Sequence, residues 1–266
     1  MNAYAHHELF HAVQHSYAGS FRLTSYDWVS EGTADAAVAS DTEMHRTPID
    51  DPRPVNVPLT SFEGFYPYQA QDFWVYLFQA NHRALPLGEL GSFLKRGLTT
   101  ELVAQVLASP PSTFYLGLGG EYWIWVKNQV LEKTVNFDGA LTNPCVLELA
   151  LIGRSPTDGA DITWPASDHV FGDLEGLQAK LVKIQFTTAV NNVTITAEGG
   201  GGENVLAYKV FRNGEPDCAD PNKVPDGKRQ FESVAAGDLV YVLLADMQYD
   251  EKAPAPLFEV RVIAPK

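Results

Sequence analysis

The spacing of hydrophobic residues changes beyond the middle of this chain of 266 residues. Before the change, apolar side chains recur every three or four residues, the period of a helix with one buried face. After it they alternate with polar residues, as in strands that bury one side. The change falls between Gly153 and Pro165, where Pro, Gly, Ser and Asp are frequent. We therefore predict an α+β protein with a mainly helical region over residues 1–155 and a β-sandwich over residues 160–266.

Helical periodicity recurs in several segments of the first region. The first segment contains no Gly or Pro and stops at Gly19, and the second is rich in alanine, a strong helix former. The prolines between Thr47 and Pro58 enforce an irregular stretch. The predicted helices cover Met1–Ala18, Trp28–Ser40, Tyr68–His82, Leu87–Lys95, Glu101–Ala108 and Glu121–Lys133.

Alternating runs in the second region are separated by glycine-containing turns such as Asn213-Gly214 and Asp226-Gly227. Six or seven short strands in about 100 residues are typical of an immunoglobulin-like β-sandwich. The residues expected to face its core are Val182, Ile184 and Phe186; Leu206, Tyr208 and Val210; Val240, Val242 and Leu244; and Phe258, Val260 and Val262.

Charge and composition exclude several classes of partner. The net charge is −14, and a surface this acidic repels phosphates, so we expect no nucleic-acid partner. No run of about 18 apolar residues is present, so we expect no membrane span. Residues Met1 to His7 are polar and aromatic and do not have the pattern of a signal peptide. The first candidate functional residue is already His7. We therefore expect the chain to begin inside a longer parent protein, whose upstream part directs it to a secreted or periplasmic location.

The pattern His-Glu-x-x-His occupies residues 7–11. On a helix, His7 and His11 lie one turn apart on the same face, so their imidazoles can converge on one metal ion. Glu8 projects about 100° around the axis from His7, which leaves it to take a proton from a metal-activated water. The alternative is a pair of surface histidines beside a solvated carboxylate.

A catalytic zinc ion needs a third protein ligand. The extended pattern with a third histidine fails, because Gln14 and Tyr17 occupy its remaining positions. His15 lies about 12 Å along the helix from His7, too far to share one ion with both histidines. We interpret His15 as a partly exposed helical residue.

Glu31, twenty residues after His11, is the better candidate for the third ligand because it opens the second predicted helix. Asp35 follows one turn later on the same face and can accept a hydrogen bond from the second ring nitrogen of His7, which would orient that ring. The alternative is that two acids at a helix N-terminus meet the positive end of the helix dipole.

His-Glu-x-x-His followed by Glu-x-x-x-Asp resembles the gluzincin zinc metallopeptidases, the family of thermolysin and the aminopeptidase-type enzymes. The motifs cover about residues 3–40 and the likeness extends loosely to residue 140. The resemblance implies that zinc is held by His7, His11 and Glu31, that Asp35 supports a ligand, and that Glu8 is the general base. It also implies hydrolysis of a peptide or protein substrate.

Aminopeptidase-type relatives place a tyrosine downstream of the third ligand, where it hydrogen-bonds the developing oxyanion. In this chain Tyr68 is the candidate and Tyr66 the second choice. The alternative for either tyrosine is an aromatic residue of the core or its rim.

The chain departs from the gluzincin pattern because the family places a β-sheet before the catalytic helix, whereas only six residues precede His7. The competing hypothesis is therefore a truncated or inactive zincin-like protein whose β-sandwich binds another protein or a cell-wall component.

The chain contains two cysteines, Cys145 and Cys218, which are either two free thiols or one disulfide.

Overall fold

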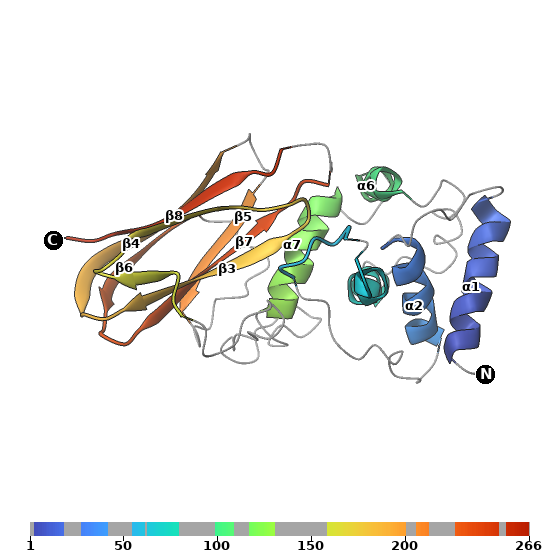
Figure 1. Cartoon of the computed structure of the whole chain (residues 1–266), viewed down its shortest axis with the longest axis horizontal. Helices are drawn as coiled ribbons and strands as arrows, with labels where there is room; N and C mark the ends of the chain where they lie inside the picture. Colours follow the sequence, from blue (N-terminus) through green and yellow to red (C-terminus); the bar gives the residue numbers. More distant parts are fainter. Residues whose placement is uncertain are drawn as a thin grey trace. The chain divides into compact units, whose positions relative to one another are not determined.

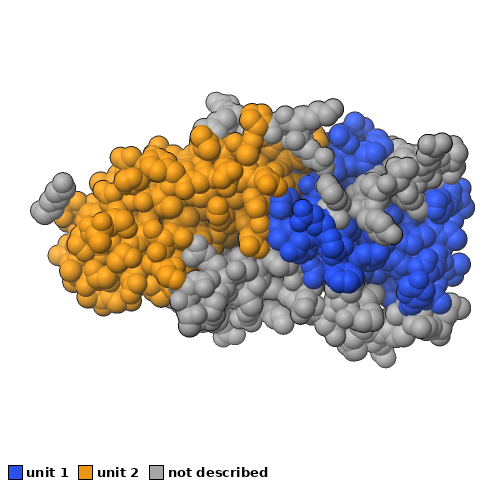
Figure 2. Space-filling model, in the orientation of Figure 1, with its two compact units in different colours: residues 1–53, 57–125 blue, residues 54–56, 126–266 orange. Residues whose placement is uncertain are grey.

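The computed structural model describes residues 3–18, 28–41, 55–61, 63–79, 99–108, 117–130, 159–200, 206–212, 227–249 and 254–265 (Figure 1). The chain divides into two compact units (Figure 2). Unit 1 consists of residues 1–53 and 57–125, and unit 2 of residues 54–56 and 126–266. The predicted helix Leu87–Lys95, Cys145 and Cys218 lie outside the described residues. The predicted domain boundary adjoins residues that are also outside them, so it stays a prediction.

The described part of unit 1 is mainly helical, and five of the predicted segments form helices. The helix predicted from Tyr68 differs, because it begins two residues earlier and is interrupted at Ala70. None of the described helices is long and apolar enough to cross a membrane. The helices are α1 (Ala3–Ala18), α2 (Ser30–Asp41), α3 (Tyr66–Gln69), α4 (Gln71–Gln79), α6 (Thr100–Ala108) and α7 (Gly117–Val130), the last of which continues past the division between the units.

The first turns of helix α2 are buried on all sides. Every residue from Trp28 to Ala36 is buried, because α1 contacts one side of α2 while α3 and α4 contact another. A helix in this position has no polar outer face, which explains its run of small residues. Glu31 and Asp35 are charged groups within this buried stretch, so each needs a polar partner.

An aromatic cluster supports α2 from the side of α4. The rings of Trp28 and Trp74 stack with centroids 5.2 Å apart, and Phe73 meets Trp125 edge-on at 5.6 Å. The Trp74 indole N–H donates to the carbonyl oxygen of Trp28 at 3.0 Å, and the Trp28 indole N–H donates to Thr100 Oγ1 at 3.0 Å. These hydrogen bonds fix two large, almost fully buried rings against the start of α2.

Unit 2 contains two four-stranded sheets, in the orders β1-β3-β7-β5 and β2-β8-β4-β6. Residues from both sheets form one hydrophobic core, so the unit is a β-sandwich as predicted. All twelve residues expected to face the core are described except for the side chain of Leu206; ten are in the core and Tyr208 packs against it. The strands are β1 (Ile162–Trp164), β2 (His169–Asp173), β3 (Ala179–Phe186), β4 (Val190–Gly200), β5 (Leu206–Arg212), β6 (Lys228–Val234), β7 (Leu239–Asp246) and β8 (Leu257–Ile263).

The connectivity of the sandwich differs from the immunoglobulin-like order that we predicted. In the described ladders no strand pairs with its neighbour in sequence, and successive strands alternate between the two sheets. An immunoglobulin sheet instead contains consecutive strands as neighbours. The period of two determines which side chains face the core, but pairing depends on contacts between distant segments.

A short segment from the first half of the chain, residues 54–56, also belongs to unit 2. The Val55 carbonyl oxygen accepts a hydrogen bond from the Ala179 N–H at 2.8 Å.

Candidate metal centre

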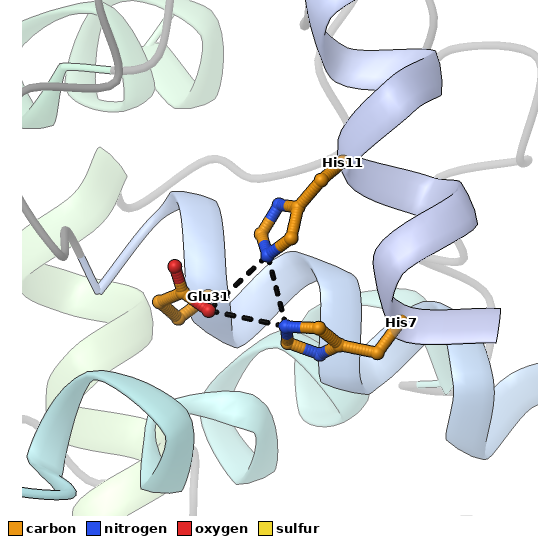
Figure 3. Close-up of side chains that lie close together, drawn as sticks. All are labelled: His7, His11 and Glu31. Carbon is orange, nitrogen blue, oxygen red and sulfur yellow. Dashed lines mark hydrogen bonds and ion pairs between the residues drawn. The ribbon is translucent and has the colours of Figure 1, made fainter. Parts of the chain in front are cut away.

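Three side chains from α1 and α2 converge at one point in unit 1 (Figure 3). His7 and His11 point from successive turns of α1 toward Glu31, in the first turn of α2. His7 Nε2 lies 2.9 Å from His11 Nε2, and Glu31 Oε2 lies 3.2 Å and 3.3 Å from these two nitrogens. The structure therefore brings together the three residues that the sequence singled out as ligands.

These distances fit a small divalent ion. Tetrahedral ligands at about 2.0–2.1 Å from zinc lie about 3.3 Å from one another, and the three observed separations are 2.9, 3.2 and 3.3 Å. The side chains of His7, Glu31 and His11 are 9%, 10% and 15% exposed, so the group is not completely sealed from solvent. No fourth Asp, Glu, His or Cys of the described residues joins it. Three protein ligands and access for a fourth are typical of catalytic zinc sites.

The other ring nitrogen of His7 is held by Asp35. His7 Nδ1 lies 2.7 Å from Asp35 Oδ1, and both residues are buried. Because an ionised carboxylate can only accept, the Nδ1 atom carries the proton and donates it in this hydrogen bond. In the neutral ring, the Nε2 atom then carries a lone pair, which faces His11 and Glu31. Asp35 thus has the contact with His7 that its spacing predicted.

Gln14 holds the Nδ1 atom of His11, as Asp35 holds that of His7. Its Nε2 atom donates to the Ser30 carbonyl oxygen at 3.0 Å and to Thr33 Oγ1 at 2.9 Å. Because a carbonyl oxygen can only accept, the amide must be oriented with its oxygen toward His11 Nδ1, 2.7 Å away. His11 Nδ1 is therefore the donor, and its Nε2 also presents a lone pair to the centre. Two lone pairs and a carboxylate oxygen at this separation repel one another unless they share a cation, either a proton or a metal ion.

The pKa values of the three residues show how strongly the centre favours positive charge. Burial opposes protonation of His7, but its contacts with Asp35 and Glu31 prevail and raise its pKa to about 9. Burial likewise opposes ionisation of Glu31, yet hydrogen bonds from His11 and His7 lower its pKa to about 2. The hydrogen bond with Glu31 also raises the pKa of His11. A metal ion must displace protons from this centre, so its affinity falls as the pH falls.

Close packing behind Glu31 sets the position of α2. An added Cβ at Gly32, the next residue, would lie 2.7 Å from Trp74 Cδ1 and 3.1 Å from the Ala70 Cβ. The indole cannot move aside easily, because its N–H is bonded to the Trp28 carbonyl oxygen. Only glycine at this position lets α2 approach the aromatic cluster so closely.

We predict that Gly32→Ala destabilises unit 1 and weakens metal binding. Alanine within a helix is normally about 1 kcal/mol more favourable than glycine, but overpacking here costs about 1–3 kcal/mol and displaces the turn that carries Glu31. Thermal unfolding followed by tryptophan fluorescence, with and without zinc, measures both effects. Replacement of glycine by alanine on an uncrowded helix would make the protein more stable. A Gly32→Ala variant more stable than the wild type therefore contradicts the packing argument.

Tyr68 lies beside the centre. The Tyr68 and His7 rings are 6.0 Å apart between centroids and tilted by 32°. Tyr66, the second choice, is the first residue of α3. Glu8 is exposed and is not one of the converging side chains, and its carboxylate raises the pKa of the Tyr4 phenol through a hydrogen bond. His15 is exposed, in agreement with its interpretation as a helical surface residue.

Two residues that matter for this geometry were missed in the sequence. In the sequence, Gln14 stands out only because it breaks the extended histidine pattern. Its spacing from His11, three residues along the same helical face, was a usable signal. Gly32 had no such signal, because the need for glycine arises from Trp74 and Ala70, about 40 residues away.

Comparisons with known proteins identify no family for the chain. No protein-family model and no curated protein match it. Among solved structures, the pre-peptidase C-terminal domain of a collagenase from Bacillus anthracis matches with 14% identity and a TM-score of 0.26, over 41% of this chain and 99% of that domain. A periplasmic inhibitor of g-type lysozyme from Aeromonas hydrophila, PliG, matches with 16% identity and a TM-score of 0.25, over 38% of this chain and 95% of the inhibitor. At these TM-scores neither match carries an argument about fold or function.

Proposed function

We propose that the chain is a zinc-dependent peptidase whose metal centre is formed by His7, His11 and Glu31. The observation that carries the proposal is the convergence of these three ligand atoms, together with the partners that fix both histidine rings. Asp35 and Gln14 hold the Nδ1 protons, so both Nε2 lone pairs are available to the ion. Such supporting hydrogen bonds are typical of metal-binding histidines.

The choice of zinc and of peptide hydrolysis rests on the His-Glu-x-x-His sequence and its likeness to gluzincins. Bound zinc supplies a Lewis acid that lowers the pKa of a water molecule and polarises a substrate carbonyl. Glu8, exposed on α1 next to His7 in sequence, takes the proton and delivers it to the leaving amine. Tyr68, beside His7, donates a hydrogen bond to the developing oxyanion.

The proposal includes the wider setting of this centre. Unit 1 then corresponds to a zincin-type catalytic region and the β-sandwich to an accessory domain that binds a substrate, another protein or a cell-wall component. A secreted or periplasmic location suits both roles.

Equilibrium dialysis followed by elemental analysis tests the proposal. We expect one zinc ion per chain, and we expect hydrolysis of a quenched fluorescent peptide library that a chelator stops and added zinc restores. The elemental analysis also reports any other divalent ion bound in place of zinc. A folded chain that takes up no stoichiometric metal refutes the proposal. A chain that binds zinc without cleaving any peptide favours the zincin-like binding module instead.

A further inference from the structure

We propose that Gln14 is a positioning residue of the metal centre, which fixes the tautomer of His11 and ties α1 to the turn of α2 that carries Glu31. This inference rests on the proposed zinc site and assigns a role to a residue outside the motif. Gln14 is 0% exposed, and both ends of its amide are hydrogen-bonded. A buried side chain whose donors and acceptor are all used is held in one orientation.

The first role concerns the proton on His11. A neutral imidazole carries its proton on either nitrogen, and only the tautomer with a free Nε2 lone pair can bind a metal at this centre. The Gln14 oxygen, 2.7 Å from His11 Nδ1, favours that tautomer. Without an acceptor at Nδ1, the proton of His11 can occupy Nε2 instead. Glu31 Oε2 lies 3.3 Å from Nε2 and can accept a hydrogen bond from it.

The second role concerns the separation of the two helices. Gln14 donates to the Ser30 carbonyl oxygen and to Thr33 Oγ1, on either side of Glu31 along α2. Thr33 is free to accept because its own hydroxyl donates to the Val29 carbonyl oxygen at 2.6 Å. One side chain of α1 therefore contacts both the ring of His11 and the backbone next to Glu31. It couples the two ligands that are contributed by different helices.

The two histidines receive different kinds of support. Asp35 accepts from His7 with a charged carboxylate, whereas Gln14 accepts from His11 with a neutral amide. The carboxylates of Glu31 and Asp35 together balance the two positive charges of a zinc ion. A glutamate in place of Gln14 keeps an acceptor for His11 but loses the donor to α2. A methionine of similar size loses both.

Zinc affinity of Gln14→Glu and Gln14→Met tests the assignment, with His15→Gln as the control for a neighbouring exposed residue. Dissociation constants are measured by competition with a chromophoric chelator, and the stability of each metal-free protein by thermal unfolding. We expect Gln14→Met to bind zinc about 10–100-fold more weakly than the wild type. We expect Gln14→Glu to retain most of the affinity and His15→Gln to retain all of it.

The glutamate comparison separates positioning from folding. Both variants lose the hydrogen bonds to Ser30 and Thr33, so a purely structural role lowers stability and zinc affinity alike in both. Equal affinities of Gln14→Glu and Gln14→Met overturn the control of the His11 tautomer by Gln14, and no loss in either variant overturns both roles; the zinc site is left intact in each case. A wild-type chain that binds no zinc overturns the proposed function and this inference together.

A spectrum of the zinc-loaded wild type provides a measurement that does not depend on variants folding. The ¹⁵N shifts of the His11 ring report which nitrogen binds the metal and which carries the proton. We expect a protonated, hydrogen-bonded Nδ1 and a metal-bound Nε2. Zinc on Nδ1 of His11, or an Nδ1 proton that exchanges freely with solvent, contradicts the proposed contact with Gln14.

Discussion

Replacing Glu31 with glutamine is expected to weaken zinc binding more than 100-fold, a larger loss than removal of a supporting hydrogen bond causes. The variant removes the one anionic ligand atom, Oε2, that faces both imidazoles at 3.2 Å and 3.3 Å. A ligand that binds only the folded chain stabilises it by about 4 kcal/mol at a thousand times its dissociation constant. The wild type is therefore expected to melt at a clearly higher temperature with zinc, and Glu31→Gln is expected to lose this difference.

Glutamine at position 31 is suited to this test because it does not leave the two histidines without a partner. Its amide can donate to the Nε2 lone pair of His7 or His11, so the metal-free variant is expected to fold. Glu101→Gln is the matched control, since Glu101 is exposed in the first turn of α6 in the same unit and carries the same charge. Zinc binding by a folded Glu31→Gln as tight as that of the control would exclude Glu31 as a ligand.

The part of the centre that the sequence predicts is the part governed by local helix geometry. His7 and His11 are four residues apart, and on any helix this places them on one face. Glu31 and Asp35 follow the same rule on the second helix. Local helix geometry does not predict that the two helices pack together. That prediction depended on the chemical need for a third metal ligand and for a hydrogen-bond partner of His7. The contacts of Gln14 with α2, and of Gly32 with Trp74 and Ala70, depend on the packing distance itself, which no spacing encodes.

The sandwich shows the same division between local and distant information. Strand alternation identified the inner faces of β3, β7 and β8, because side chains two residues apart share a face whatever the pairing partner is. The order of the strands in each sheet differed from the expected one. Pairing of β3 with β7, for example, joins residues about 60 positions apart, such as Val182 and Val242. Nothing in either strand alone specifies the other.

The largest effect on activity is expected for Glu8→Gln, which should retain one zinc ion and lose peptide hydrolysis about 10²–10⁴-fold, the range for loss of a general base. Zinc should stay because Glu8 is not among the converging side chains and is exposed to solvent. The amide has the same shape as the carboxylate but cannot accept the proton that is released when water attacks the substrate. The loss should therefore appear in the turnover number, measured with saturating peptide and with the metal content of each preparation determined.

Glu63→Gln is the control for Glu8→Gln, because Glu63 is another exposed acid of unit 1. Its turnover should equal that of the wild type. Tyr4 sharpens the comparison, since the hydrogen bond between its phenol and Glu8 ties up part of the carboxylate. Tyr4→Phe frees that oxygen and keeps the aromatic ring, so it should leave hydrolysis intact where Glu8→Gln removes it. If Glu8→Gln instead hydrolyses peptides at the wild-type rate with zinc in place, the proton must go elsewhere, and the His-Glu-x-x-His segment contributes ligands but no base.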